Sequence, residues 1–290
     1  MPAGNLIDLR RRVRSVKNIR QITRAMKFVS ASKLKRAQQR IEDARPYAKR
    51  MLQVLNSVAA RLEGAPHPLL EQREGDRTML VVITSDKGLC GAFNTNIIRA
   101  AARYIESEQL NESISLTLVG RKGVDWFKRR TWPVKHQYVN IMSQVDFEYA
   151  QQIARTLIDY YGDSKLDSVY LVYNEFKSVI QQEIVIEPLL PIQRLEGQEE
   201  QRGTGYIWEQ PPDVVLDRLL PKHVETQIFR AMLESEAAEH GARMTAMDSA
   251  TRNAKEVIDD LTLKANRIRQ ASITTEIIEI VSGAEALEQE

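Results

Sequence analysis

A short segment in the middle of the chain, residues 85–91 (SDKGLCG), carries the residue types of a phosphate-binding loop. It lies between a predicted strand and a predicted helix, where such loops occur. A P-loop, however, has four residues between its two glycines, and Lys and Ser or Thr follow the second glycine. Here two residues separate Gly88 from Gly91, and Ala92 and Phe93 come next. The spacing favours a tight turn between strand and helix over a nucleotide or other cofactor site.

Cysteine and histidine form no catalytic or metal-binding pattern either. Cys90 is the single cysteine of the chain, which excludes an internal disulfide. No histidine lies near it in the motif to activate it, so we interpret it as a small packed side chain. The four histidines are isolated from one another, and none has a second ligand at metal-site spacing. We therefore predict no catalytic residue and no metal site. The histidines are His67, His136, His223 and His240.

The charge of the chain is concentrated near its N-terminus. Between Arg10 and Arg40 there are 12 Lys or Arg residues and no Asp or Glu, although the net charge of the chain is +2. Such a block fits nucleic-acid phosphates, the acidic loops of a partner protein, or a solvated helix face. Phe28 is the first aromatic residue and Tyr47 the next, so bases would find little to stack on. Composition alone leaves these interpretations open.

The elements that carry these residues begin with a long N-terminal helix, predicted from Leu6 to Leu62. Its apolar residues recur every three or four positions, which is the pattern of a coiled-coil seam. Pro46 interrupts the pattern, but the apolar phase is the same on both sides of it, so one helix is expected. Upstream of residue 34 the pattern continues with one phase slip. The predicted seam is Leu9, Val13, Val16, Ile19, Ile22, Met26, Val29, Leu34, Ala37, Ile41, Ala44, Ala48, Met51, Leu55, Val58 and Leu62.

A second long helix is predicted from Val214 to Leu287, with a more mixed set of apolar positions. Both helices far exceed the usual length of about a dozen residues, and neither could bury its apolar stripe in a small domain. We expect them to pair as an antiparallel coiled coil. Because the second helix is the longer, its last turns, residues 273–287, should project unpaired. Apolar residues cover about half of its circumference there, so a surrounding partner is expected.

The segment between the helices has the pattern of an α/β domain with a Rossmann-like arrangement. The predicted strands are residues 79–83, 114–118, 169–173 and 184–186, and the predicted helices are residues 94–107 and 147–158. Strands that alternate with helices indicate a small sheet domain. We therefore divide the chain into residues 1–62, a middle domain of residues 75–192, an exposed loop of residues 193–212, and residues 213–287. No apolar run is long enough to span a membrane, and residues 1–9 lack the apolar stretch of a secretory signal.

Four segments resemble the γ subunits of F-type ATP synthases. They are residues 273–286 (ITTEIIEIVSGAEA), 247–254 (MDSATRNA), 22–33 (ITRAMKFVSASK) and 85–91 (SDKGLCG). The resemblance covers the whole chain, and its most specific segments lie at the two ends. It implies an antiparallel coiled coil of the terminal helices and a central α/β domain, in agreement with the pattern of the residues.

The resemblance also implies a function, partners and contact residues. A γ subunit is the central rotor shaft: its coil runs inside a hexamer of α and β subunits, and its middle domain meets the ε subunit and the membrane ring of c subunits. Proton flow turns ring and shaft, which drives conformational changes in the β subunits. The motifs place Met26 and Lys27 opposite acidic loops of β. They place Arg269, Gln270, Thr274, Glu276 and Glu279 as polar contacts to α and β, and Ile278 in the enclosed end.

The resemblance further implies a chain with no active site and no cofactor of its own, no nucleic-acid partner and only indirect membrane contact. Chloroplast relatives carry an inserted segment with a regulatory cysteine pair, and the single cysteine excludes such control. The lack of a transit peptide favours a bacterial complex on the cytoplasmic face of the plasma membrane. Two alternatives are weighed: a coiled-coil adaptor with a basic helix for nucleic acid or acidic proteins, and a small α/β enzyme, for which catalytic residues are missing.

Overall fold

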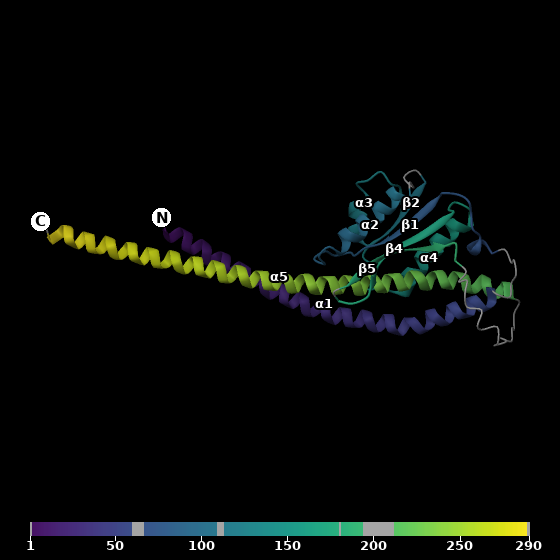
Figure 1. Ribbon diagram of the computed structural model, residues 1–290, viewed down its shortest axis with the longest axis horizontal. Helices are drawn as coiled ribbons and strands as arrows, with labels where there is room; N and C mark the ends of the chain where they lie inside the picture. The colour runs from purple at the N-terminus through teal and green to yellow at the C-terminus, as the bar shows by residue number, and fades with distance from the viewer. Residues whose placement is uncertain (1, 60–66, 109–112, 180, 194–211, 289–290) are drawn as a thin grey trace. The chain divides into compact units, whose positions relative to one another are not determined.

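The computed structural model describes residues 2–59, 67–108, 113–179, 181–193 and 212–288. Helix α1 spans Pro2–Ala59 and helix α5 spans Pro212–Glu288, and each continues through an internal proline (Figure 1). The two long terminal helices are therefore confirmed. The expected end of the first at Leu62, and most of the expected loop of residues 193–212, lie outside the described residues. None of the described helices has an apolar stretch that could cross a membrane.

Between the two long helices the chain forms a five-stranded sheet. Its strands are β1 (Thr78–Ile83), β2 (Ile114–Val119), β3 (Val134–Tyr138), β4 (Ser168–Phe176) and β5 (Gln182–Leu190). The order is β3-β2-β1-β4-β5; the first four strands run parallel and β5 runs antiparallel to β4. All residues of β1 and β2 are buried, which explains why β1 reads as a continuous apolar run.

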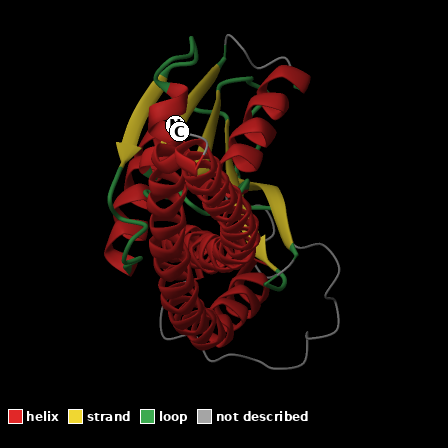
Figure 2. Cartoon of the chain, turned by 90° about the vertical axis from the view of Figure 1, so that its left-hand side faces the viewer, coloured by secondary structure: helices red, strands yellow, loops and turns green. Residues whose placement is uncertain are grey.

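Helices cover both faces of this sheet (Figure 2). On one face, helices α2 (Phe93–Ser107) and α3 (Arg121–Phe127) pack on Leu80 and Val82 of β1. On the other face, helix α4 (Phe147–Gly162) and parts of α1 and α5 pack on the alternate side chains of β1. The result is a three-layer domain in which the side chains of β1 from Met79 to Ile83 alternate between the two cores, and the predicted α/β fold is confirmed.

Three short elements have no counterpart in the sequence prediction: α3, β3 and the 3-10 helix η1 (Pro68–Leu70). Strand β3 is an edge strand whose residues alternate between half-buried and exposed, so it lacks the apolar run that identifies β1. Helix α3 begins after Gly120, which has a φ of +91°; a Cβ there would lie 2.1 Å from the carbonyl oxygen of Thr84. Glycine is required at that turn.

Contacts within the chain divide it into two compact units. One unit, the terminal pair, consists of residues 1–29 and 244–290; the other, residues 30–243, contains the sheet and the adjoining parts of α1 and α5. The predicted division gives each long helix a domain of its own. The observed division cuts both helices, because residues 30–59 and 212–243 share their core with the sheet.

Candidate functional site

The last described turns of α5 form an exposed apolar surface, here called the exposed tip, residues 273–282. Every residue of this segment is exposed, and α5 continues past the point where α1 begins (Figure 1). Its large apolar side chains are Ile273, Ile277, Ile278, Ile280 and Val281, with exposed fractions of 48, 55, 58, 71 and 57%. The expectation of unpaired, apolar final turns agrees with these exposures. Large apolar side chains that are exposed together on one helix are typical of an interaction surface.

The helix of the exposed tip is supported by its own polar side chains. The Thr274 hydroxyl donates to the Gln270 carbonyl over 3.0 Å, and the Thr275 hydroxyl donates to the Ala271 carbonyl over 3.0 Å. Gln270, Thr274 and Ile278 are four residues apart, so they lie on one face of the helix. A polar and an apolar group therefore stand side by side on an exposed surface that α1 does not cover.

The structure places the other predicted contact residues of α5 close by. Arg269, Glu276 and Glu279 are all exposed. Arg269 and Glu276 are seven residues apart, and Glu279 follows Glu276 by three, so these charges share a face of the helix. Ser272, just before the exposed tip, is the last residue of α5 that is half-buried among those whose burial is described.

Within the terminal pair, α1 and α5 run antiparallel and pack through a heptad seam. On α5, Met247, Ala254 and Ile258 are 5, 8 and 6% exposed. On α1, Leu9 and Val13 are half-buried. The hydroxyl oxygens of Thr23 and Thr251 lie 2.8 Å apart, which fixes the register between the two helices. The expected antiparallel coil is confirmed.

The predicted phase slip in the seam of α1 is wrong. Ile19, Ile22 and Val29, which the prediction assigns to the seam, are 49, 59 and 58% exposed. The heptad spacing instead continues without interruption, through Thr23 (8% exposed) and the half-buried Lys27. The prediction assigns the wrong residues here because the seam itself carries polar side chains. An assignment by hydrophobicity selects the isoleucine and valine residues beside them instead.

Polar residues can occupy this part of the seam because each has a partner on α5. The Lys27 ammonium lies 2.6 Å from the Asp248 carboxylate, and this hydrogen bond lowers the pKa of Asp248 below its ordinary value. Arg252 adds a weaker contact to Asp248 at 3.6 Å. Both Lys27 and Asp248 side chains are 37% exposed, so water screens the pair. Met26, the neighbouring predicted contact residue, is half-buried.

The basic block of α1 is an exposed surface over most of its length. Within residues 10–29 of α1 the exposed cations are Arg10, Arg11, Arg12, Arg14, Lys17 and Arg24. Arg12 lies 3.0 Å from Asp8, one turn earlier on the same helix, and such exposed pairs contribute little stability. The block presents positive charge along one stretch of α1 that also carries the exposed Ile19 and Ile22.

In the sheet domain, residues 85–91 form a turn that binds protein groups on several sides. The Asp86 carboxylate accepts hydrogen bonds from the backbone N–H groups of Arg121, Asn140 and Met142 at 3.0, 2.7 and 2.9 Å. It thereby joins the end of β1 to the ends of β2 and β3. Asn94, at the start of α2, accepts from the Ser85 N–H at 3.0 Å. The sequence prediction misses these roles, although an Asp three residues after the end of a buried strand is the available signal.

The same turn directs the carbonyl groups of Lys87 and Gly88 toward α5. The Arg243 guanidinium donates to the Gly88 carbonyl over 3.1 Å and to the Glu239 carboxylate over 2.5 Å. The Arg243 and Glu239 side chains are both buried. Burial raises the pKa of Glu239, whereas the Arg243 charge opposes that rise. A phosphate needs N–H donors, so this arrangement supports the interpretation of residues 85–91 as a structural turn.

The crevice where an open α/β sheet usually binds its ligand is filled by protein. Such ligands sit where the strand order reverses, which here lies beyond the C-terminal ends of β1 and β4. Cys90, Phe93 and Ala238 pack there against Phe176 and Ala242. Cys90 is 2% exposed, in agreement with a packed side chain, and its burial raises the pKa of the thiol. Among the described residues, no group of three or more His, Cys, Asp or Glu could hold a metal ion.

Comparisons with known proteins identify the family. A family model described as "ATP synthase" matches residues 5–287. The chain is 52% identical to the "ATP synthase gamma chain" of Solibacter usitatus over 98% of this chain and 99% of the relative. It is 48% identical to the "ATP synthase gamma chain" of Geobacter metallireducens over the same shares.

Solved structures give the same fold. One chain of the Tetrahymena thermophila mitochondrial ATP synthase, from a structure of its "central stalk/cring", has a TM-score of 0.61 and 29% identity, covering 79% of this chain and 99% of that one. One chain of the Euglena gracilis mitochondrial ATP synthase has a TM-score of 0.69 and 22% identity, covering 98% and 95%. On the length and strength of these matches, the chain belongs to the ATP synthase gamma chain family.

Proposed function

We propose that this chain is the central rotor shaft of a proton-translocating F-type ATP synthase. It couples rotation of a membrane ring of c subunits to conformational cycling of the catalytic β subunits. The observation that carries the proposal is the exposed tip, a single helix whose large apolar side chains are 48–71% exposed. Such a surface is unfavourable in water and is stabilised when a partner protein encloses it. A coiled-coil adaptor, the alternative, would not account for a full-length match to gamma chains.

The proposal assigns a partner to each surface. A hexamer of α and β subunits encloses the exposed tip and surrounds the terminal pair, and the ε subunit and the c ring contact the sheet domain. The Tetrahymena neighbour, a chain solved as part of a central stalk together with a c ring, supports this assignment. No nucleic acid is involved, and contact with the membrane is indirect.

Individual residues of the exposed tip and its neighbourhood are proposed as contacts to the hexamer. Gln270 and Thr274 supply hydrogen-bonding groups beside the apolar Ile278, on one face of α5. Arg269, Glu276 and Glu279 supply charge nearby. On α1, Met26 and Lys27 face acidic loops of β. Because the Lys27 ammonium already binds Asp248 at 2.6 Å, Lys27 would contact a β loop only by sharing or breaking that ion pair.

The chain itself is proposed to be non-catalytic, a peripheral subunit of a complex on the cytoplasmic face of a bacterial plasma membrane. The relatives compared above are bacterial, which supports this location. The Gly88 carbonyl is bound to Arg243 in the turn that resembles a phosphate loop, which supports the absence of a nucleotide site. Isothermal calorimetry of the free chain with ATP tests it. Micromolar binding that is lost in Lys87→Ala would contradict the proposal.

Reconstitution of truncated chains with α and β subunits tests the proposed function as a rotor shaft. A chain that ends after Ser272 lacks the exposed tip but keeps the whole heptad seam, so its melting temperature should stay close to that of the full chain. Its yield of complex, or its coupling of proton transport to ATP turnover, should fall strongly. A chain that ends after Gly283 is the milder control, because it keeps the whole exposed tip and loses only the residues beyond it. Normal assembly and coupling of the shorter chain would refute the proposal.

A further inference from the structure

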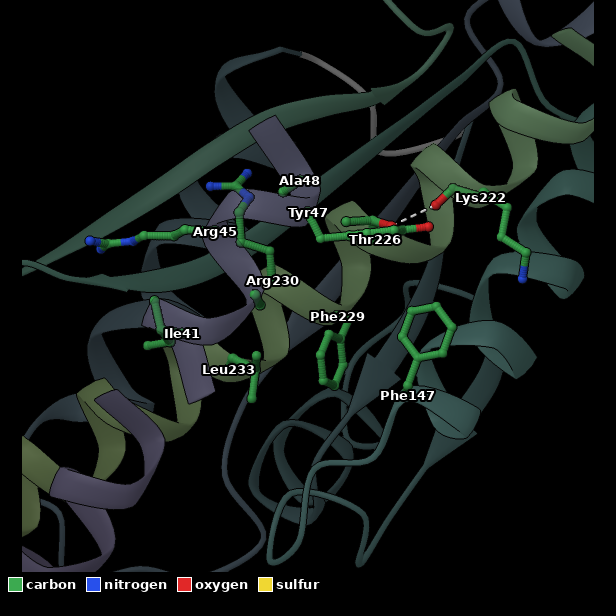
Figure 3. A pocket seen from close by; sticks show the side chains of 11 residues that line it. Ile41, Arg45, Tyr47, Ala48, Phe147, Lys222, Thr226, Phe229, Arg230 and Leu233 are labelled. Carbon is green, nitrogen blue, oxygen red and sulfur yellow. Dashed lines mark hydrogen bonds between the residues drawn. The ribbon is translucent and has the colours of Figure 1, made fainter. Parts of the chain in front are cut away.

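A cavity of about 440 Å³ lies in the sheet domain between α1, α4 and α5 (Figure 3). Helix α1 contributes Ile41, Ala44 and Ala48, α4 contributes Phe147, and α5 contributes Phe229 and Leu233, among others. The cavity adjoins the core that these helices share with the sheet, and no side chain fills it. Its volume falls in the range of about 300–1,000 Å³ that is typical of small-molecule sites.

The cavity exists because the seam of α1 carries small residues at this level. Ala44 and Ala48 are consecutive seam positions, and both are half-buried and not covered by a larger neighbour. Across from them, the rings of Phe147 and Phe229 meet edge to face with centroids 5.3 Å apart. This contact holds the aromatic wall in place. The wall opposite Ala44 and Ala48 is therefore aromatic.

The charged side chains that line the cavity are all cations: Arg45, Lys222 and Arg230. Two of them have close acidic partners, since Lys222 lies 2.7 Å from Glu225 and Arg230 lies 2.5 Å from Glu187. Arg45 is exposed; its charge acts on the buried Glu234, but it forms no ion pair with any residue that the structure describes. An apolar cavity with an exposed guanidinium at its edge is complementary to an apolar ligand that carries one negative charge.

We propose that this cavity binds a single-chain amphiphilic carboxylate of the fatty-acid class. The hydrocarbon chain lies against Phe147, Phe229 and Leu233, and the carboxylate meets the Arg45 guanidinium at the edge. Arginine suits this role because its planar group can bind both oxygens of a carboxylate. A bound chain contacts α1, α4 and α5 at once, so it stabilises the folded state and raises the melting temperature with ligand concentration.

Binding of dodecanoate to the full chain, below its micelle-forming concentration, tests the proposal by calorimetry and by thermal melting. The expected result is one saturable site per chain. Arg45→Glu should weaken binding at least tenfold, whereas Arg50→Glu, at an exposed arginine on α1 outside the cavity lining, should leave it unchanged. Ala48→Trp fills the cavity and should abolish binding. If Ala48→Trp fails to fold, the Arg45→Glu and Arg50→Glu pair still decides the question.

Two further measurements separate the proposal from its alternatives. Dodecyltrimethylammonium has the same chain length and the opposite charge, and it should bind at least tenfold more weakly. Equal binding of the two probes, non-saturable binding, or equal effects of Arg45→Glu and Arg50→Glu would overturn the proposal. The assembled complex with α, β and ε subunits should also bind dodecanoate. Loss of the site on assembly would show that a partner subunit occupies the cavity, and would overturn the proposal too.

Discussion

In the sheet domain, Ile97 and Ile105 of α2 are fully buried, whereas Ile278 and Ile280 of the exposed tip are 58 and 71% exposed. All four lie on helices. The difference is that α2 has a sheet to cover its apolar face, and the tip of α5 extends past the start of α1. The same residue type thus stabilises the fold in one region and is available for a partner in the other.

Charged residues differ between the two regions in the same way. In the sheet domain, Glu239 and Arg243 are both buried, and they bind each other and the turn of residues 85–91. In the terminal pair, Lys27 and Asp248 form an ion pair that is open to water. Removing one partner of a buried pair leaves an uncompensated charge and costs about 3–5 kcal/mol, whereas an exposed pair can exchange its partner at little cost.

The largest expected effect contrasts Ile97→Asp with Ile278→Asp in the free chain. A carboxylate at Ile97 would enter an apolar core with no partner, so the free energy of unfolding should fall by about 4 kcal/mol or more. At Ile278 the carboxylate stays in water, and the change should be within about 0.5 kcal/mol. Urea unfolding followed by circular dichroism measures both.

Ile278→Asp, the milder substitution for stability, should be the one that impairs the assembled complex. Ile278→Asp should fold normally and then lower the yield or ATPase rate of the reconstituted hexamer, because assembly would bury its charge. If Ile278→Asp unfolds the free chain while surviving molecules assemble normally, the side chain belongs to an internal core and the contrast between the regions is wrong.

The next effect concerns Arg243→Met, which removes the cation from a buried pair. Glu239 would remain buried and unpaired, so we expect a loss of about 3–5 kcal/mol in the free energy of unfolding. The double variant Arg243→Met with Glu239→Gln should recover part of this loss, because it removes the unpaired charge. Arg252→Met is the matched control, since the Arg252 side chain is 70% exposed. Equal effects of Arg243→Met and Arg252→Met would contradict the prediction.

The sequence predicts those parts of the fold in which one local pattern dominates. Strand β1 and helix α2 are recognisable because their apolar residues follow the period of the element, and the long helices because they continue for many turns. Strand β3 and helix α3 escape prediction because an edge strand and a seven-residue helix bury too few side chains to produce a pattern. These elements depend on tertiary contacts, such as the Asp86 hydrogen bonds.

The sequence predicts where the exposed tip lies, but it does not predict which residues of α1 face α5 in the seam. The exposed tip follows from the difference in helix length, and its apolar residues are visible in the sequence. The seam near Thr23 is misplaced because hydrophobicity ranks Ile22 above Thr23, although Thr23 bonds to Thr251 and Ile22 lies outside the seam. Pairing across helices decides the phase there, and one helix alone does not contain that information.

A smaller effect is expected from pH at His223, in the sheet domain. Burial, with a further contribution from the Arg230 charge, lowers the pKa of His223 from 6.5 to about 4. The unfolded chain takes up this proton near pH 6.5 and the folded chain only near pH 4. The stability that neutral His223 contributes is therefore complete above pH 6.5 and is lost as the pH falls to 4. The loss should be about 3 kcal/mol, because each pKa unit corresponds to about 1.4 kcal/mol.

His223→Gln isolates this effect. The difference in the free energy of unfolding between wild type and variant should change by that amount between about pH 7 and pH 4, because the variant has no proton to take up at this position. A difference that stays constant over this range would show that the buried histidine does not control the acid sensitivity of the sheet domain.

The smallest effect is expected at Asp248, in the terminal pair, and over a different pH range. The hydrogen bond from Lys27 holds the pKa of Asp248 below its ordinary value of 3.8, so the ion pair contributes its full stability above pH 3.8 and loses it as the pH falls through the lowered pKa. Asp248→Asn should lower the melting temperature slightly at about pH 7 and low salt. Asp259→Asn, on an exposed face of the same helix, is the matched control and should leave the melting temperature unchanged.

The effect of Asp248→Asn should shrink in high salt, because both partners are open to water. It should vanish once the pH lies well below the lowered pKa of Asp248. Equal melting temperatures of the two variants at neutral pH would mean that the Lys27–Asp248 pair adds nothing to the coil, and that the polar seam near Thr23 depends on the threonine contact alone.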